Sequence, residues 1–328
     1  ATLCPPGESE CDDQTSEAPV RYLDGVLIYR TPALSFPGKG RSFSISLGYN
    51  NNPDGVLTTD FHCGVNWWLQ GVPFIEQRPD GTLLLMWGAT GKAEFAPAGT
   101  GKWVGLHGVS AQIVLQEDEL DEGQPKETVY ALKGLYGGRA YFHLLDHPEL
   151  YMRGKVKRII TRAGKEINFS YNQNGPQEIV DTNENHWNFV YDNNTGRLQA
   201  IYVWHPPYPL GEMTFEYYTG LGRCGSTGDL KTVTITEYTS SGQTVSRTFF
   251  FAYYTTTDKA HLLRFILQAE SYERAASKGI DFDNPYQVQS FADFEFDYSF
   301  QGSRGRFVAV EKVRNGCLLY TSDAADEG

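Results

Sequence analysis

The sequence has little positive charge and no long apolar run. Lys and Arg together number 28 against 40 Asp and Glu, which gives a formal net charge of -12. A protein that binds nucleic-acid phosphates needs a basic surface, so this balance argues against a nucleic-acid partner. A membrane-spanning helix needs roughly 18 consecutive apolar residues. No such run occurs, and we expect no membrane span.

Signatures of common catalytic and metal sites are also missing. The chain has no Cys-x-x-Cys pair at zinc spacing and no Gly-x-Ser-x-Gly nucleophile elbow. The stretch "GTGKW" at 99–103 lacks the full spacing of a phosphate-binding loop and is interpreted as a turn. The sequence therefore predicts a protein that is not an enzyme, with no catalytic residue, no cofactor and no metal.

Aromatic residues and glycine are abundant instead. The chain of 328 residues holds 20 Tyr, 19 Phe and 34 Gly. This composition favours many short strands joined by glycine-bearing turns over helices. One short helix is expected in "ESYERAASKG" at 270–279, where Gly279 would end it.

The strongest pattern is an apolar-x-Phe-x-Tyr triplet that occurs five times, as "INFSY", "WNFVY", "MTFEY", "FFFAY" and "FEFDY". Period-2 spacing places the aromatic residues of each triplet on one face of a strand. Each triplet is followed by a polar or glycine-bearing connection and a second apolar run, which predicts a repeated β-hairpin. The structural aromatics of these repeats are Phe169, Tyr171, Trp187, Phe189, Tyr191, Phe215, Tyr217, Phe251, Tyr253, Phe296 and Tyr298.

These hairpins predict an all-β fold of antiparallel hairpin repeats that form a long curved sheet or a partial shell. Residues 1–18 are polar and acidic and are expected to be a flexible leader. A β-rich lead-in region is predicted at 19–150, and the regular hairpins at 151–316. The last residues, 317–328, do not look like the repeats and resemble a translated sequencing-adapter tail, so we expect them not to be native.

Residues 19–316 resemble the RHS/YD-repeat family of large hairpin-repeat proteins. The resemblance lies in "FVYDNNTGRLQAI", which has the form Phe-x-Tyr-Asp followed by Gly-Arg-Leu, and in the lead-in "APVRYLDGVLIYRTPALSFPGKGRSFSISLGYNN". Only Tyr191–Asp192 is a literal Tyr-Asp, and the repeat lengths are irregular, which departs from a regular closed shell.

The resemblance implies a non-catalytic scaffold within a larger secreted or cell-surface protein. Such a scaffold would enclose, display or deliver a C-terminal cargo domain, and its partners would be that cargo and further repeats of the same chain. The family parallel implies an extracellular or cell-surface location. Because the chain lacks an initiator Met and a variable C-terminal domain, we expect the native protein to be longer.

An adhesion or carbohydrate-binding module is the alternative, because exposed aromatics can stack on sugar rings. The candidates for stacking are Trp67, Trp68, Trp87, Trp103 and Trp204, although core packing is the favoured interpretation. In this alternative the partner is a cell-surface glycan, or a second copy that joins through an open sheet edge.

A few polar clusters are possible sites. His143 and His147, with Asp146 between them, would converge on a helix, but "GGRAYFHLLDHPEL" predicts a strand that runs into a turn, where we expect them not to converge. The acidic stretches at 117–123 and 281–285 lack calcium-loop spacing and favour solvated loops.

The cysteines offer a further set of possible sites. Cys224 lies among small residues without an evident base, so a catalytic thiol is not favoured. Cys4 and Cys11 flank a Pro-Pro-Gly turn, so a small disulfide loop and two free thiols are both compatible with the sequence.

Overall fold

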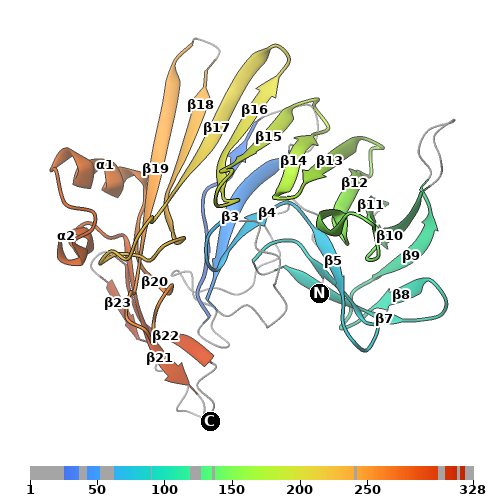
Figure 1. The fold of residues 1–328 in the computed structure, drawn as a ribbon, viewed down its shortest axis with the longest axis horizontal. Helices are drawn as coiled ribbons and strands as arrows, with labels where there is room; N and C mark the ends of the chain where they lie inside the picture. Colours follow the sequence, from blue (N-terminus) through green and yellow to red (C-terminus); the bar gives the residue numbers. More distant parts are fainter. Residues whose placement is uncertain are drawn as a thin grey trace.

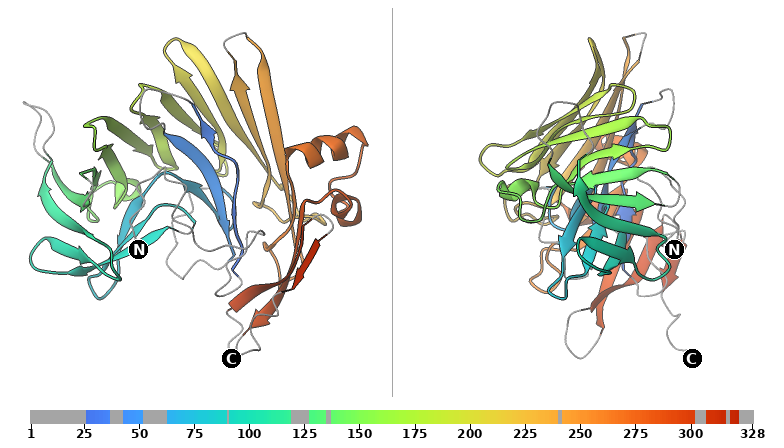
Figure 2. Two further views of the ribbon diagram at one scale, coloured as in Figure 1. Left: turned by 180° about the vertical axis from the view of Figure 1, so that it is seen from behind. Right: turned by 90° about the vertical axis from the view of Figure 1, so that its right-hand side faces the viewer.

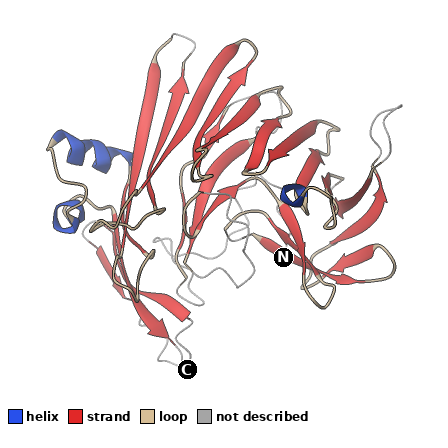
Figure 3. Cartoon of the chain, in the orientation of Figure 1, coloured by secondary structure: helices blue, strands red, loops and turns tan. Residues whose placement is uncertain are grey.

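The computed structural model describes residues 26–36, 43–51, 63–89, 91–118, 127–134, 137–239, 242–301, 307–315 and 318–321. Figure 3 shows that strands dominate the regular structure of these residues, with loops between them and helices confined to small segments. The predicted all-β class, built of antiparallel hairpins in a long sheet, is confirmed. Among the described residues, no helix is both long and apolar enough to cross a membrane.

A small sheet near the N-terminus forms the first layer. Strand β3 lies at its centre and pairs antiparallel with its three neighbours. Its four strands are β1 (Ile28–Arg30), β2 (Leu34–Ser35), β3 (Ser44–Asn50) and β4 (Trp67–Gln70). The central strand reads "SISLGYN", and its buried Ile45, Leu47 and Tyr49 follow the period-2 pattern expected of a half-buried strand.

The second layer is a long sheet in which each strand pairs antiparallel with the next strand in the sequence. The chain enters it directly after β4. Its first strands are β5 (Phe74–Gln77), β6 (Leu83–Met86), β7 (Lys92–Pro97), β8 (Lys102–Gly105), β9 (Ala111–Glu117), β10 (Thr128–Gly134) and β11 (Arg139–Phe142).

The beginning of the long sheet curls back on itself. A short 3-10 helix, η1 (Leu150–Met152), follows β11. Just after it, Lys155 makes an isolated bridge with Phe74 of β5, and the Ile75 amide donates to the Gly154 carbonyl at 2.8 Å. The sheet then continues from β11 into β12, so the pairing runs without a break across residue 150, where the sequence predicted the end of the lead-in.

The predicted hairpin repeats build the rest of the sheet, which curves around the small sheet (Figures 1 and 2). Consecutive strands pair throughout. They are β12 (Val156–Ile160), β13 (Glu166–Asn172), β14 (Gly175–Val180), β15 (His186–Tyr191), β16 (Leu198–His205), β17 (Tyr208–Tyr217), β18 (Leu230–Tyr238), β19 (Thr244–Tyr253), β20 (Leu263–Leu267), β21 (Phe294–Gln301), β22 (Phe307–Asn315) and β23 (Leu318–Thr321).

Strand β23 falls inside 317–328, the stretch predicted not to be native. It pairs with β22 and extends the sheet by one strand. That residues 317–328 are not native stays a prediction.

Two helices lie between β20 and β21. The predicted helix is confirmed as α1 (Ala269–Ser277), and Gly279, at φ +65°, lies just beyond its end in the left-handed region that favours glycine. The second helix, α2 (Pro285–Gln289), was not predicted from the sequence. Its start is capped by the Asn284 side chain, which accepts from the Tyr286 amide at 3.1 Å.

Candidate functional site

The two sheets pack face to face, and the repeat aromatics lie in the interface between them. Phe43, next to β3, meets Trp187 of β15 edge-on, with ring centroids 5.2 Å apart. It also contacts Phe169 of β13 in the same way at 6.2 Å. The small sheet thus covers the aromatic face of the hairpins.

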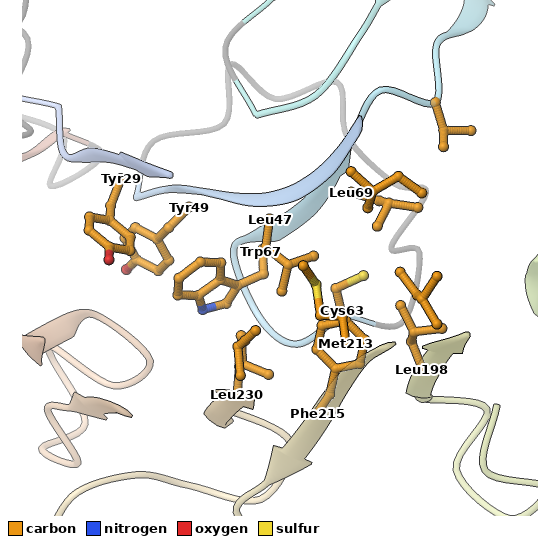
Figure 4. Close-up of a cluster of buried hydrophobic side chains, with 14 of the residues drawn as sticks. Tyr29, Leu47, Tyr49, Cys63, Trp67, Leu69, Leu198, Met213, Phe215 and Leu230 are labelled. Atoms are coloured by element: carbon orange, nitrogen blue, oxygen red, sulfur yellow. The ribbon is translucent and has the colours of Figure 1, made fainter. Parts of the chain in front are cut away.

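The centre of this interface is a cluster around Trp67 of β4 (Figure 4). The indole of Trp67 lies 4.7 Å from the ring of Phe251, and its Nε1 donates to the Tyr253 hydroxyl at 2.8 Å. Tyr49 joins the same cluster and accepts the Leu263 amide on its hydroxyl oxygen at 3.0 Å. The Trp67 indole N–H and the Tyr49 hydroxyl thus have hydrogen-bond partners inside an apolar core. These bonds fix the position of the small sheet, in addition to the apolar surface that the contact buries.

The five repeat tyrosines all occupy an equivalent irregular position. At each one the strand register shifts by a residue relative to the following strand, immediately before the tyrosine. Such a shift is a β-bulge, which turns a side chain away from the direction that a regular strand would give it. The tyrosines and their partners on the following strand are Tyr171 with Pro176, Tyr191 with Leu198, Tyr217 with Leu230, Tyr253 with Leu263 and Tyr298 with Val310.

Four of these tyrosines donate to the backbone of the preceding repeat, an arrangement that we call the tyrosine latch. The acceptor is in every case the carbonyl of the residue that pairs with the previous repeat tyrosine. The bonds are Tyr191 to Pro176 at 3.0 Å, Tyr217 to Leu198 at 2.8 Å, Tyr253 to Leu230 at 2.7 Å and Tyr298 to Leu263 at 2.6 Å. Each repeat is therefore tied to the one before it by the same hydrogen bond.

The first repeat has no preceding repeat to which its tyrosine could donate. Tyr171 belongs to the first triplet, and its buried hydroxyl has no hydrogen-bond partner among the described residues. Gly175, at φ +136°, lies beneath the Tyr191 hydroxyl, and a Cβ there would lie 2.6 Å from that oxygen.

Burial raises the pKa values of Tyr191, Tyr253 and Tyr298 above the usual tyrosine range. These hydroxyls therefore stay protonated and remain donors.

The literal Tyr-Asp of the family pattern stabilises a turn. The Asp192 carboxylate accepts from the Asn194 amide at 3.1 Å and from the Thr195 amide at 2.7 Å. Hydrogen bonds from Thr195 lower the pKa of Asp192 below the ordinary aspartate value. Its role is therefore local turn chemistry, which Asn can also supply.

A second cluster lies at the curled end of the long sheet and consists of Glu127, His143 and His147. One ligand atom from each lies within 4.8 Å of the other two. The expectation that the two histidines would not converge is wrong, because the chain reverses after β11 and brings their ring centroids to 5.2 Å. Glu127 was missed because it lies far from the histidines in the sequence, just before β10. The pairing of Tyr130 with Phe142 carries the residues before β10 toward this turn.

The protonation of this cluster is set by its surroundings. Burial lowers the pKa of His143, which leaves a neutral imidazole at neutral pH. Burial acts in the opposite sense on Glu127, but the hydrogen bond and charge of Lys157 prevail and lower the pKa of this carboxyl. A carboxylate and a neutral imidazole are both competent metal ligands.

A charged network borders the cluster. Lys157 Nζ lies 2.6 Å from Glu127 Oε2 and 2.8 Å from Asp118 Oδ2. The buried Arg158 guanidinium holds the other Asp118 oxygen at 2.5 Å and Glu166 at 3.1 Å. Because Asp118 is almost fully buried, these two cations are needed to balance its charge.

The remaining candidates are occupied by structural roles or fall outside the described residues. Cys224 is buried, and burial raises the pKa of its thiol to about 12, so it is protonated at neutral pH and a poor nucleophile. In the stretch 281–285, Asp283 Oδ1 accepts the Arg223 amide at 3.0 Å. Cys4, Cys11 and most of the acidic stretch at 117–123 lie outside the described residues.

The tryptophans divide into two groups. Trp67, Trp68 and Trp103 are buried, as core packing predicts, and Trp87 is half-buried against the core. Trp204 differs, because it is half-buried on the opposite face of β16 from Ile201 and Val203 and stacks on His186 at 4.6 Å.

No protein-family model matches the chain, and a search of curated proteins returned no match. One solved structure that it resembles is that of TcdB2-TccC3-Cdc42, with a TM-score of 0.47 and 10% identity. The match covers 70% of this chain and 16% of that one, so this chain spans a small part of the matched protein's length. A likeness at this level identifies neither a family nor a function.

Proposed function

We propose that this chain is a non-catalytic scaffold: a hairpin-repeat segment of a larger secreted or cell-surface protein that encloses, displays or delivers a C-terminal cargo. The tyrosine latch is the observation that carries the proposal. A hydrogen bond that recurs from one repeat to the next makes the sheet extendable, because each added hairpin finds the same acceptor on its predecessor.

The packing of the two layers supports the same role. Aromatic rings such as Trp187 and Phe251 are fully buried, and so are Tyr49 and Trp67 of the small sheet. These buried aromatic side chains pack against one another and are not accessible to a substrate. In this proposal they make the two layers a rigid wall. The resemblance of 19–316 to RHS/YD-repeat proteins supplies the specific form of the proposal, in which the wall surrounds a cargo.

The test begins with the native gene. A long sequencing read past the codon for Gly316 is expected to show more Phe-x-Tyr hairpins and then a variable C-terminal domain. If it does, that full-length protein and its isolated C-terminal domain should be digested with the same protease. Enclosure predicts slower cleavage of the domain within the full-length chain. Equal cleavage rates, or a reading frame that ends without a further domain, would contradict the proposal.

Glycan binding is a second candidate because of one exposed aromatic face. Tyr202 and Trp204 share the outer face of β16, and the side chain of Tyr202 is 44% exposed. Tyr208 of the neighbouring β17 is 68% exposed. Binding to a glycan array that is lost in Tyr202→Ala, but kept in Tyr286→Ala on α2, would support this function. Absence of any glycan signal would exclude the glycans tested.

A further inference from the structure

The cluster of Glu127, His143 and His147 has the composition of a transition-metal site. Two imidazole nitrogens and one carboxylate oxygen suit zinc and related divalent ions, whereas calcium prefers oxygen ligands alone. The atoms that converge are Glu127 Oε1, 3.5 Å from His143 Nδ1 and 3.9 Å from His147 Nε2. Tetrahedral zinc with bonds of about 2.0–2.1 Å holds its ligand atoms about 3.3 Å apart. The two distances from Glu127 are close to this value, and the three ligand atoms, which lie within 4.8 Å of one another, would draw together further around an ion.

His143 provides the independent sign that a ligand is expected here. Its side chain is only 9% exposed, and among the described residues its Nδ1 has no hydrogen-bond partner, the nearest acidic oxygen being Glu127 Oε1 at 3.5 Å. A buried nitrogen without a partner is costly and calls for an explanation. The backbone amide of His143 donates to the Lys155 carbonyl at 2.9 Å, which fixes the start of the turn.

Neighbouring groups hold the other two ligands in place. Lys157 occupies Glu127 Oε2 at 2.6 Å and leaves Oε1 directed at the histidines. His147 Nδ1 lies 3.4 Å from the Glu149 carbonyl and 3.1 Å from the Glu149 amide nitrogen. When Nε2 binds a metal, the ring proton resides on Nδ1, which donates to that carbonyl and gives up the bond from the amide. Such outer contacts orient metal-binding histidines in known sites.

We propose that Glu127 Oε1, His143 Nδ1 and His147 Nε2 bind one divalent transition-metal ion of the zinc class, with water in the remaining position. The ion would join the residue before β10 to the turn after β11. This turn adjoins the bridge between Phe74 and Lys155, so the ion would stabilise the curled end of the long sheet. The site is independent of the scaffold proposal, which needs no metal.

The test uses the full 328-residue chain after treatment with a chelator. Zinc alone is titrated by calorimetry, and Co²⁺ alone by its visible absorption, which reports the coordination geometry. We expect one ion per chain at this site and a higher melting temperature with zinc. The Co²⁺ complex should lack thiolate charge-transfer absorption, because the site has no cysteine. Co²⁺ bound instead to any of the five cysteines of the chain would show that absorption.

Variants decide whether the ion sits where we place it. His147→Gln and Glu127→Gln should each weaken binding at least tenfold, whereas His205→Gln, at an exposed position on β16, should bind as the unaltered chain does. Far-UV circular dichroism and the urea midpoint without metal show whether each variant is folded. Unchanged binding in both folded variants would overturn the proposal. A dissociation constant weaker than about 1 mM in the unaltered chain would also overturn it.

Discussion

The hydroxyl of Tyr253 donates to the carbonyl oxygen of Leu230 at 2.7 Å and accepts the indole N–H of Trp67 at 2.8 Å. One side chain thus joins its own repeat, the preceding repeat and the small sheet. Because Tyr253 is almost fully buried, water cannot replace either bond if it is lost. The aromatic triplets are therefore points of attachment as well as apolar surface.

Tyr253→Phe should lower the free energy of unfolding by about 1–3 kcal/mol for each buried group that is left without a partner. Urea denaturation measures the change. Tyr208→Phe is the matched control, because that side chain is 68% exposed and should lose less than about 0.5 kcal/mol. Equal losses in the two variants would show that the latch adds nothing.

The protein should lose stability as the pH rises above about 10. Burial raises the pKa values of Tyr191, Tyr253 and Tyr298, so these groups keep their protons in the folded chain while the unfolded chain releases them. The folded state then binds more protons, and stability falls with rising pH by about 1.4 kcal/mol per pH unit for each such tyrosine. Below the unfolded pKa this stability is fully present.

The slope is measured from urea denaturation at several pH values, with phenolate absorption as the reporter of ionisation. Tyr253→Phe should reduce the slope by about 1.4 kcal/mol per pH unit, which corresponds to one proton fewer released on unfolding. An unchanged slope would mean that Tyr253 ionises in the folded protein.

Phe189→Ala should cost about 3–5 kcal/mol, because Phe189 is buried in the core cluster that residues of both sheets form. Val190, the next residue, points to the other face and is 40% exposed. Val190→Ala should change the free energy of unfolding far less. Similar changes in both would contradict the assignment of the two faces.

Gly175→Ala should destabilise the chain, because its φ of +136° disfavours a side chain and the new Cβ would meet the Tyr191 hydroxyl. In the Tyr191→Phe background that contact is absent, so the cost should be smaller, although the backbone strain remains. A double-mutant cycle measures the coupling. Gly220→Ala, where a Cβ has open space, is the control.

The two sheets should unfold together. Phe43 lies in the same buried cluster as the repeat aromatics, so undocking the small sheet would expose the core of the long sheet. Circular dichroism and tryptophan fluorescence should therefore give coincident urea transitions. Phe43→Ala should lower the common midpoint. Two separate transitions in the unaltered chain would show that the layers fold independently.

The strands and their buried faces were predictable because the information is local. Alternation of Trp187, Phe189 and Tyr191 fixes one apolar face whatever lies opposite, and glycine-bearing turns determine where the hairpins reverse. The helix ending before Gly279 was likewise set by its own residues. The antiparallel hairpin fold is therefore the part that the sequence determined by itself.

Only the tertiary structure decided what each face meets. Trp67 and Tyr253 are 186 residues apart in the sequence, so no local pattern could predict that the small sheet forms the second layer. The latch depends on a bulge before each tyrosine, which redirects a side chain that regular alternation would place elsewhere. Glu127 reaches the two histidines through the register of β10 with β11, and pairing registers are set by whole sheets rather than by single segments.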